Sequence, residues 1–316
     1  MSAPGGLTHR LARLGEEGLY LGLHQTFRML PTEACSDAGA RLSGILGRRS
    51  HPVSEGRSRV LLARLRPDWA EPAALEAAVG RTWENAGRVY AEYSVLHRLI
   101  REGRVTEAEP GLLQALTAPG QGPAIFAFLH LGNWEVVAHR LAHLTQGRGM
   151  GVGAPPASAV RGAIFRRWHD SLPGITRPTS LGVWREVVEM LRKPDGAVLL
   201  NIDEPNAVSV SAPFFGRPVR ADGNLGKAVR LAAAARARIV IAYAERLAGV
   251  RFVIHALPVV EVDPRATGVG PETEGEVLRI DAMIAPVIRR LADQWHMAAY
   301  FGTDVEAVAP QTAPLA

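Results

Sequence analysis

Apolar positions recur at helical spacing through the first third of the chain. From Leu7 to about Leu116, apolar side chains return every three or four residues, which is the spacing of one face of an amphipathic helix. Prolines interrupt this pattern where helices are expected to begin or end, at Pro31, Pro52, Pro67 and Pro110. The pattern therefore predicts that residues 1–119 form a helical N-terminal segment packed on the rest of the protein.

The first predicted helix, Leu7 to Leu30, combines an apolar face with a basic flank. The apolar face is formed by Leu7, Leu11, Leu14 and Leu21, widened by Leu19 and Leu23. The flank is formed by Arg10, Arg13, His24 and Arg28. Glycines at positions 15, 18 and 22 lower the helix propensity. A basic amphipathic helix can lie in a membrane interface or can cover its own domain, and the sequence leaves both open.

After Gly120 short apolar runs alternate with helical stretches, which is typical of βαβ units and a parallel sheet. Strands are expected at residues 124–129, 149–153, 197–202, 239–243 and 251–257. Helices are expected at residues 133–145, 157–171, 181–191, 227–235 and 274–293, the last kinked at Pro286. The predicted class is α/β, with a mostly parallel central sheet flanked by helices, a core at 120–305 and a flexible tail at 306–316.

Composition and charge narrow the function. The 316 residues are 47% apolar and 21% charged, which is ordinary for one globular domain with an N-terminal extension. No window approaches the roughly 18 to 20 apolar residues of a membrane span, and the start lacks a signal-peptide core, so a cytoplasmic protein is expected. Cys35 is the only cysteine, which excludes an intrachain disulfide.

The charge balance favours an anionic partner. Lys and Arg number 36 against 31 Asp and Glu, which gives a net charge of +5. A phosphate-bearing lipid would suit this charge. The arginines are scattered among predicted helices without interleaved aromatic residues, and no helix-turn-helix or zinc-finger spacing is present, so no nucleic-acid partner is expected.

One pair of polar residues suits acid–base chemistry. His130 stands at the end of a predicted strand and Glu135 in the first turn of the following helix, at the strand end where α/β sheets bind ligands. A neutral imidazole can take a proton from an attacking hydroxyl, and a carboxylate can orient it by accepting its other N–H. The pair predicts His130 as general base and Glu135 as its orienting partner.

A metal centre is the competing interpretation of the same helix. Glu135, His139 and His143 recur at i, i+4 and i+8, and all three are metal-ligand types. Three ligands on one straight helix span about 12 Å and cannot converge on one ion, so acid–base chemistry is favoured. Nucleophile-elbow, Walker and dinucleotide-binding signatures are missing. The glycines at 147, 149, 151 and 153 are interpreted as a turn around a strand rather than a phosphate cradle.

The surroundings of His130 resemble a known family. His-Leu-Gly-Asn-Trp-Glu, preceded by Ile-Phe-Ala-Phe-Leu, resembles the first motif of the lysophospholipid acyltransferase superfamily, in particular its lipid A late acyltransferase and phosphatidylinositol mannoside acyltransferase branch. Three further segments are similar to the family in its order along residues 57–297. They are Arg57-Ser58-Arg59-Val60 with Arg64-Leu65 in place of an Asn-Leu pair, Ala212-Pro213-Phe214-Phe215-Gly216-Arg217-Pro218, and Asp293-Gln294-Trp295-His296-Met297.

The resemblance implies roles for further residues. Arg167 matches an arginine that serves a phosphate of donor or acceptor, although Arg166 could equally be the match. A second acid that contacts the catalytic histidine falls on Asp203 or Glu204, with Asp203 favoured. Phe214 and Phe215 could wall an acyl tunnel. Arg167, together with Asn133 or backbone N–H groups near it, is expected to hold donor phosphate or the developing negative charge.

The sequence therefore predicts an acyltransferase that needs no tightly bound cofactor. It would move a fatty acyl group from acyl-CoA or acyl-acyl carrier protein to a hydroxyl of a polar lipid or glycolipid, peripherally at the inner membrane face. One alternative is a soluble acyltransferase or amide-forming enzyme that tailors a secondary metabolite. Another is a lipid-binding protein without catalytic activity.

Overall fold

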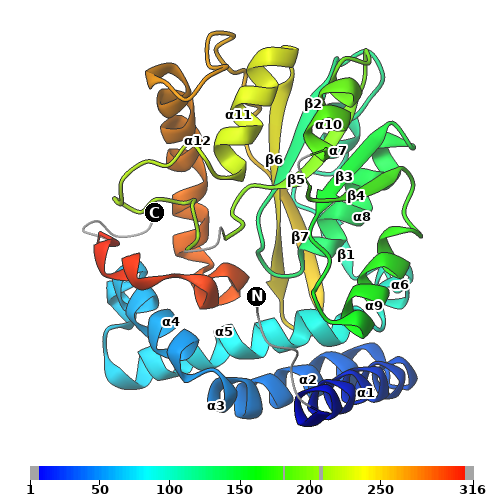
Figure 1. Ribbon diagram of the computed structural model, residues 1–316, viewed down its shortest axis with the longest axis vertical. Coiled ribbons are helices and arrows are strands. Elements are labelled where there is room, and N and C mark those ends of the chain that lie inside the picture. Colours follow the sequence, from blue (N-terminus) through cyan, green and yellow to red (C-terminus); the bar gives the residue numbers. More distant parts are fainter. Residues whose placement is uncertain (1–6, 181, 206–208, 310–316) are drawn as a thin grey trace.

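A seven-stranded sheet forms the centre of the computed structural model (Figure 1). The structure describes residues 13–180, 182–205 and 209–309, and the backbone alone of 7–12. The strands are β1 (Val105–Glu107), β2 (Ala124–Phe128), β3 (Gly149–Gly153), β4 (Ile175–Pro178), β5 (Ala197–Asn201), β6 (Arg238–Leu247) and β7 (Arg251–Ala256). Their order is β1-β7-β6-β2-β5-β3-β4, and every neighbouring pair is parallel except β6 and β7. The predicted α/β class is confirmed.

The central strand β2 supports a hydrophobic core on each face of the sheet. All five of its residues are buried, because β5 and β6 flank it and helices cover both faces. Ile125 belongs to the core on one face, and Phe126 and Phe128 to the core on the other, as the period-two alternation of a strand requires. This buried run places the residue after Leu129 at the carboxyl edge of the sheet.

Helices of the second half cover the two faces. They are α8 (Trp134–Thr145), α9 (Ala159–His169), α10 (Val183–Leu191), α11 (Asn224–Ala235) and α12 (Pro271–Arg290). Buried residues of α10, α11 and α12 join the first core, whereas those of α8 join the second with Trp168 of α9. The predicted strands and helices of this region are thus present to within a few residues, and Pro286 lies inside α12.

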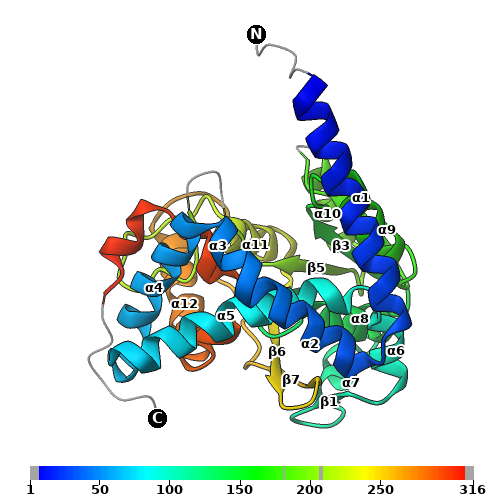
Figure 2. The ribbon, with the colours of Figure 1, turned by 90° about the horizontal axis from the view of Figure 1, so that it is seen from below.

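The N-terminal helices lie across one end of the sheet (Figure 1). The long ones are α1 (Leu7–Met29), α2 (Thr32–Leu42), α4 (Pro52–Leu65) and α5 (Pro72–Glu92). Shorter ones are the π-helical η1 (Ser43–Gly47), α3 (Arg48–Ser50), η2 (Pro67–Trp69), α6 (Leu96–Arg101) and α7 (Leu112–Leu116). In Figure 2 the N-terminal part of α1 projects away from the body of the molecule. Within the described residues, no helix is long and apolar enough to cross a membrane.

Two strands were not anticipated from the sequence. β1 lies inside the predicted helical segment 1–119 and pairs with β7, so this segment contributes an edge strand to the sheet. β4 is the opposite edge and pairs only with β3. Strands of three and four residues are too short to show alternation.

The C-terminal residues also pack further than expected. Short helices follow α12 as η3 (Ala292–Gln294), η4 (His296–Tyr300) and η5 (Thr303–Ala307). Val308 is fully buried in the first core, so the predicted tail at 306–316 begins inside the packed structure. Residues 310–316 of that range lie outside the described residues.

Candidate active site

His130 lies two residues beyond β2, at the turn that leads into α8. Asn133 caps α8, because its Oδ1 accepts a hydrogen bond from the backbone N–H of Glu135 at 3.1 Å. The backbone of His130 is fixed from both sides: its N–H donates to Asp203 Oδ2 at 2.9 Å, and its carbonyl accepts from the N–H of His296 at 2.9 Å. The strand end, the cap and a C-terminal segment thus position the imidazole.

Asp203 holds the His130 ring. Asp203 Oδ1 lies 2.8 Å from His130 Nδ1, and its Oδ2 accepts the indole N–H of Trp295 at 2.8 Å. Asp203 is completely buried, so a carboxylate with these partners fixes the Nδ1–H tautomer of His130. Nε2 then carries the lone pair, and no described residue hydrogen-bonds to it. The geometry presents His130 as a base oriented by a buried acid.

The electrostatics favour a histidine that can hold a proton. Burial by itself lowers the pKa of His130, but the adjacent Asp203 carboxylate more than offsets this, by charge and by hydrogen bond, so the pKa is raised above its ordinary value of 6.5. Glu204 and Glu135 add smaller raising contributions. Such a group can receive a proton near neutral pH and release it again.

Glu135 does not orient His130, and this expectation is wrong. Its Oε1 accepts the phenol O–H of Tyr93, which directly follows α5, and its Oε2 accepts the indole N–H of Trp168 on α9 at 2.7 Å. His169 Nε2 lies 3.3 Å from Oε2. Burial raises the pKa of Glu135, but the hydrogen bonds and charge of these neighbours lower it below the ordinary value. Glu135 therefore joins α5, α8 and α9 at the cavity wall.

Asn133 was expected near the substrate, and its contacts argue against that role. Besides capping α8, it donates from Nδ2 to Glu92 Oε2 at 2.8 Å, and its side chain is fully buried. Glu92 in turn forms a bidentate pair with Arg246 of β6 at 2.6 and 2.8 Å. The hydrogen bonds of the Asn133 side chain thus help to hold α8 against α5 and β6.

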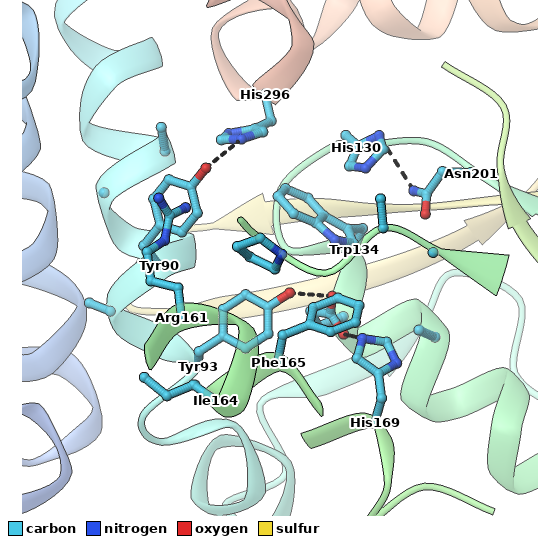
Figure 3. A pocket seen from close by; sticks show the side chains of 18 of the residues that line it. Tyr90, Tyr93, His130, Trp134, Arg161, Ile164, Phe165, His169, Asn201 and His296 are labelled. Carbon is cyan, nitrogen blue, oxygen red and sulfur yellow. Dashed lines mark hydrogen bonds and ion pairs between the residues drawn. The ribbon is translucent and has the colours of Figure 1, made fainter. Parts of the chain in front are cut away.

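A cavity of about 790 Å³ opens beside His130 (Figure 3). Around the histidine it is lined by Trp134, Asn201 and His296. Trp134 meets the His130 ring edge-on with centroids 4.7 Å apart, and Asn201 Nδ2 lies 3.4 Å from His130 Nδ1. One part of the cavity continues toward α1, η1 and α5, and another runs along β3 and α8. The cavity is large enough for an extended substrate.

The arginine in this cavity is not the predicted one. Arg166 and Arg167 are both exposed and do not line the cavity. Arg161, on the first turn of α9, does line it, with its guanidinium 4.5 Å from the ring centre of Tyr90 and 5.4 Å from that of Tyr20. No carboxylate in the described part of the chain pairs with Arg161. Its signal in the sequence was weak, because α9 carries several arginines.

Phe214 and Phe215 do not wall the cavity, and that expectation is also wrong. Both are buried in the first hydrophobic core, exposed by only 2% and 3%. Phe215 packs edge-on against Trp295 at 5.9 Å between ring centroids. Because Trp295 donates to Asp203, Phe215 supports the acid that orients His130 rather than the substrate.

Asp203 and Glu204 take different places, as neighbours beyond a strand end do. Asp203 faces His130, whereas Glu204 lines the cavity and accepts a hydrogen bond from Asn224 Nδ2 at 2.8 Å. Burial raises the pKa of Glu204 above its ordinary value, although the charge of His130 opposes this. Glu204 therefore remains a candidate for contacting substrate.

Potential metal ligands on α8 point elsewhere. The oxygens of Glu135 are occupied by Tyr93 and Trp168, while His143 is exposed and its Nδ1 contacts the carbonyl of His139 at 2.9 Å. Among the described residues, no group of three or more His, Cys, Asp or Glu side chains is arranged to hold a metal ion.

The C-terminal segment contributes residues that the sequence analysis did not assign to the site. Trp295 donates to Asp203, and His296 lines the cavity with its Nε2 3.2 Å from the phenol oxygen of Tyr90. The similarity of residues 293–297 to the family ending was the only signal for them. The arginines of the upstream similar segment serve packing instead: Arg57 donates to the carbonyl of Phe301, and Arg64 to that of Val308.

Comparison with known proteins adds no assignment. No protein-family model and no curated protein matches the chain.

Proposed function

We propose that the protein is an acyltransferase that moves a fatty acyl group from a thioester to a hydroxyl group. The observation that carries this proposal is His130, which Asp203 holds through Nδ1 while Nε2 remains unpartnered among the described residues beside a 790 Å³ cavity. A base oriented by a buried carboxylate is the arrangement that activates a hydroxyl for acyl transfer. The ordered similarity of four segments to the lysophospholipid acyltransferase superfamily supports the same reaction.

The chemistry needs one base and no covalent acyl-enzyme. The acceptor hydroxyl gives its proton to His130 Nε2 as its oxygen attacks the thioester carbonyl carbon. Collapse of the tetrahedral intermediate breaks the carbon–sulfur bond, and the imidazolium returns the proton to the departing thiolate. The products are an ester and a free thiol. Asp203 stabilises the imidazolium between these two proton transfers.

Arg161 is the cation best placed to hold a phosphate of donor or acceptor. Burial lowers its pKa, but Tyr90 and Tyr20 more than offset this, so the pKa of Arg161 is raised. A planar guanidinium without a carboxylate partner in the described residues can bind two phosphate oxygens at once. The cavity thereby joins a base, an unpaired cation and a largely apolar wall.

Thioester turnover tests the proposal. Purified protein is incubated with acyl-CoA or acyl-acyl carrier protein, with and without a membrane lipid extract, and released thiol is measured alongside mass spectrometry of the lipids. We expect thiol release that depends on the extract and one lipid class that gains an acyl mass. Absence of thiol release from both donors, with lipid extracts and with small-molecule extracts alike, would contradict an acyltransferase.

Exposed apolar residues support a membrane-borne acceptor. The inward side of α1 lines the cavity with Tyr20, while Leu14, Leu19 and Leu21 are 67%, 61% and 48% exposed. Leu11, also expected on this face, lies outside the residues whose side chains are described. The following elements α2, η1 and α4 carry further exposed apolar residues at Leu42, Ile45, Leu46 and Val53, of which Leu42 also lines the cavity. We propose that this surface rests on the inner face of the membrane, next to the cavity.

Liposome flotation should show this contact. The intact protein is expected to float with anionic liposomes at low salt and less at high salt, because attraction of about 1 kcal/mol per basic residue is screened within about 8 Å at physiological salt. Replacing Leu14, Leu19 and Leu21 together with serine should release it. The matched control replaces Leu247, Val269 and Leu278, which are exposed elsewhere. A protein that never floats would favour a soluble acceptor.

A further inference from the structure

The strand β3 presents three glycines to the cavity. Gly149, Gly151 and Gly153 alternate with Met150 and Val152, so the glycines share one face of the sheet. All three line the cavity, and Val152 also borders it, although Met150 and Val152 belong to the core on the opposite face. β3 is an inner strand, flanked by β5 and β4, yet this face of it carries no side chain.

Backbone geometry does not require glycine at two of these positions. Neither Gly151 nor Gly153 has a positive φ angle. A Cβ atom added at Gly151 would first meet Thr176 Oγ1 at 3.4 Å, and one added at Gly153 would first meet Phe165 Cζ at 3.6 Å, which are ordinary contacts. Glycine inside a strand is destabilising relative to alanine, and it often marks a place where a ligand approaches the backbone. These glycines therefore keep space open.

The space they keep open is bordered by apolar side chains. Across it lie Ala138 and Ala142 of α8, one helical turn apart, with Leu199 on the neighbouring strand and Leu172 beyond α9. Gly151 pairs with Leu199 in the β3–β5 register, and Gly149 pairs with Ala197. Of the three glycines, Gly149 therefore lies farthest from the carboxyl edge of the sheet. The three glycines extend about 13 Å along the strand.

The part of the cavity that runs along β3, called the arm below, begins at the His130 imidazole. His130 is more than nine-tenths buried, lines the same cavity at the carboxyl edge and presents Nε2 without a hydrogen bond from the described residues. A linear molecule with a reactive polar end at His130 and a hydrocarbon chain along β3 would satisfy both parts of the site.

We propose that the glycine face of β3 binds an unbranched hydrocarbon chain and sets its maximum length. This inference rests on the proposed function for the identity of the chain, which is then the acyl chain of the donor. A side chain at Gly153 would fill the arm near its entrance, and one at Gly151 would fill it deeper. The longest chain that still fits should therefore be shorter with a side chain at Gly153 than with one at Gly151. Gly149 is unsuited to such a test, because its added Cβ would lie 2.7 Å from Thr145 Oγ1.

Chain-length profiles of Gly151→Val and Gly153→Leu test the inference. Displacement of a fluorescent fatty acid by octanoate, laurate and palmitate measures binding separately from transfer. Each excluded methylene costs about fourfold in affinity, so a side chain that displaces three should weaken palmitate binding by on the order of 50-fold. Octanoate binding should change less than about threefold in Gly151→Val. In acyl transfer, the preferred donor should shift to a shorter chain.

Controls separate the inference from loss of fold and from failure of the proposed function. Gly268→Leu, at an exposed glycine with open space, should leave the profile unchanged. Gly151→Ala and Gly153→Ala should keep or slightly raise the melting temperature while weakening palmitate binding. If the native protein binds palmitate and all four variants at Gly151 and Gly153 keep its chain-length profile, the glycine inference is overturned and the proposed function is not. If the native protein binds no fatty acid, both the inference and the proposed acyl substrate fail.

Discussion

Replacing His130 with asparagine or alanine is expected to abolish acyl transfer while the protein stays folded. General base catalysis contributes about 10²- to 10⁴-fold to such reactions, so thiol release should fall at least a hundredfold. Asparagine is the sharper variant, because its side-chain N–H₂ can replace the Nδ1–H of His130 toward Asp203 and leaves no nitrogen at the position of Nε2. The buried carboxylate then keeps a partner. Steady-state thiol release and circular dichroism measure the two effects.

The control for this prediction lies on the neighbouring helix. His143 is exposed on α8, and His143→Ala should change the rate less than about twofold because it touches neither His130 nor Asp203. Treatment with a metal chelator should leave the rate of the native protein unchanged. A His130→Asn protein that keeps a tenth or more of the native rate would remove His130 from the reaction, and a rate lost on chelation would point to a metal.

The sheet could be predicted because its inner strands carry local signals. β2 and the first four residues of β5 are continuous apolar runs that need no partner information to be recognised. The edge strands β1 and β4 could not, since their three and four residues acquire strand geometry only by pairing with β7 and β3. The predicted ends of β2 and β5 placed His130 and Asp203 at the same edge of the sheet, and this is correct because the two strands are parallel neighbours.

The partner of His130 could not be derived from local spacing. His130 and Glu135 are one turn apart, but the direction of the Glu135 side chain is set by Tyr93, which lies 42 positions earlier, and by Trp168, 33 positions later. Asp203 is 73 positions from His130 and reaches it through sheet pairing. Long-range packing therefore decides which of two nearby acids meets the imidazole.

The arginine assignment failed for a related reason. Arg161 and Arg167 lie on α9 six residues apart, which places them about 120° apart around the helix axis, on different faces. The face that meets the cavity is set in part by Glu17 of α1, whose carboxylate accepts from Ala159 N–H, Val160 N–H and the Ser158 hydroxyl at the start of α9. That contact spans 141 to 143 positions and leaves no pattern in either helix.

Replacing Asp203 with asparagine should lower the rate of acyl transfer by about 10³- to 10⁴-fold with the fold preserved. The amide oxygen can still accept from the backbone N–H of His130 and from Trp295 Nε1, which both contact Oδ2. Its N–H₂ would then face His130 Nδ1, which must accept and therefore loses its proton. The imidazole proton moves to Nε2, the nitrogen that should act as base, so geometry is kept while the reactive tautomer is lost.

The pH dependence of the residual rate distinguishes this role from a merely structural one. In the native protein the base is neutral only above its pKa, which lies above 6.5, so the rate should rise with pH through a value above 6.5. Without the Asp203 charge, only the smaller contributions of Glu204 and Glu135 oppose the lowering of the His130 pKa by burial. The rising limb of the pH–rate profile of Asp203→Asn should therefore move to lower pH. Glu135→Gln is the matched control: its carboxylate contributes least to the raised pKa, and its amide can still accept from one neighbour. It should lose less than about tenfold in rate and keep the limb near its native position. If Glu135→Gln loses more activity than Asp203→Asn, or if the limb of Asp203→Asn stays in place, Asp203 does not orient the base.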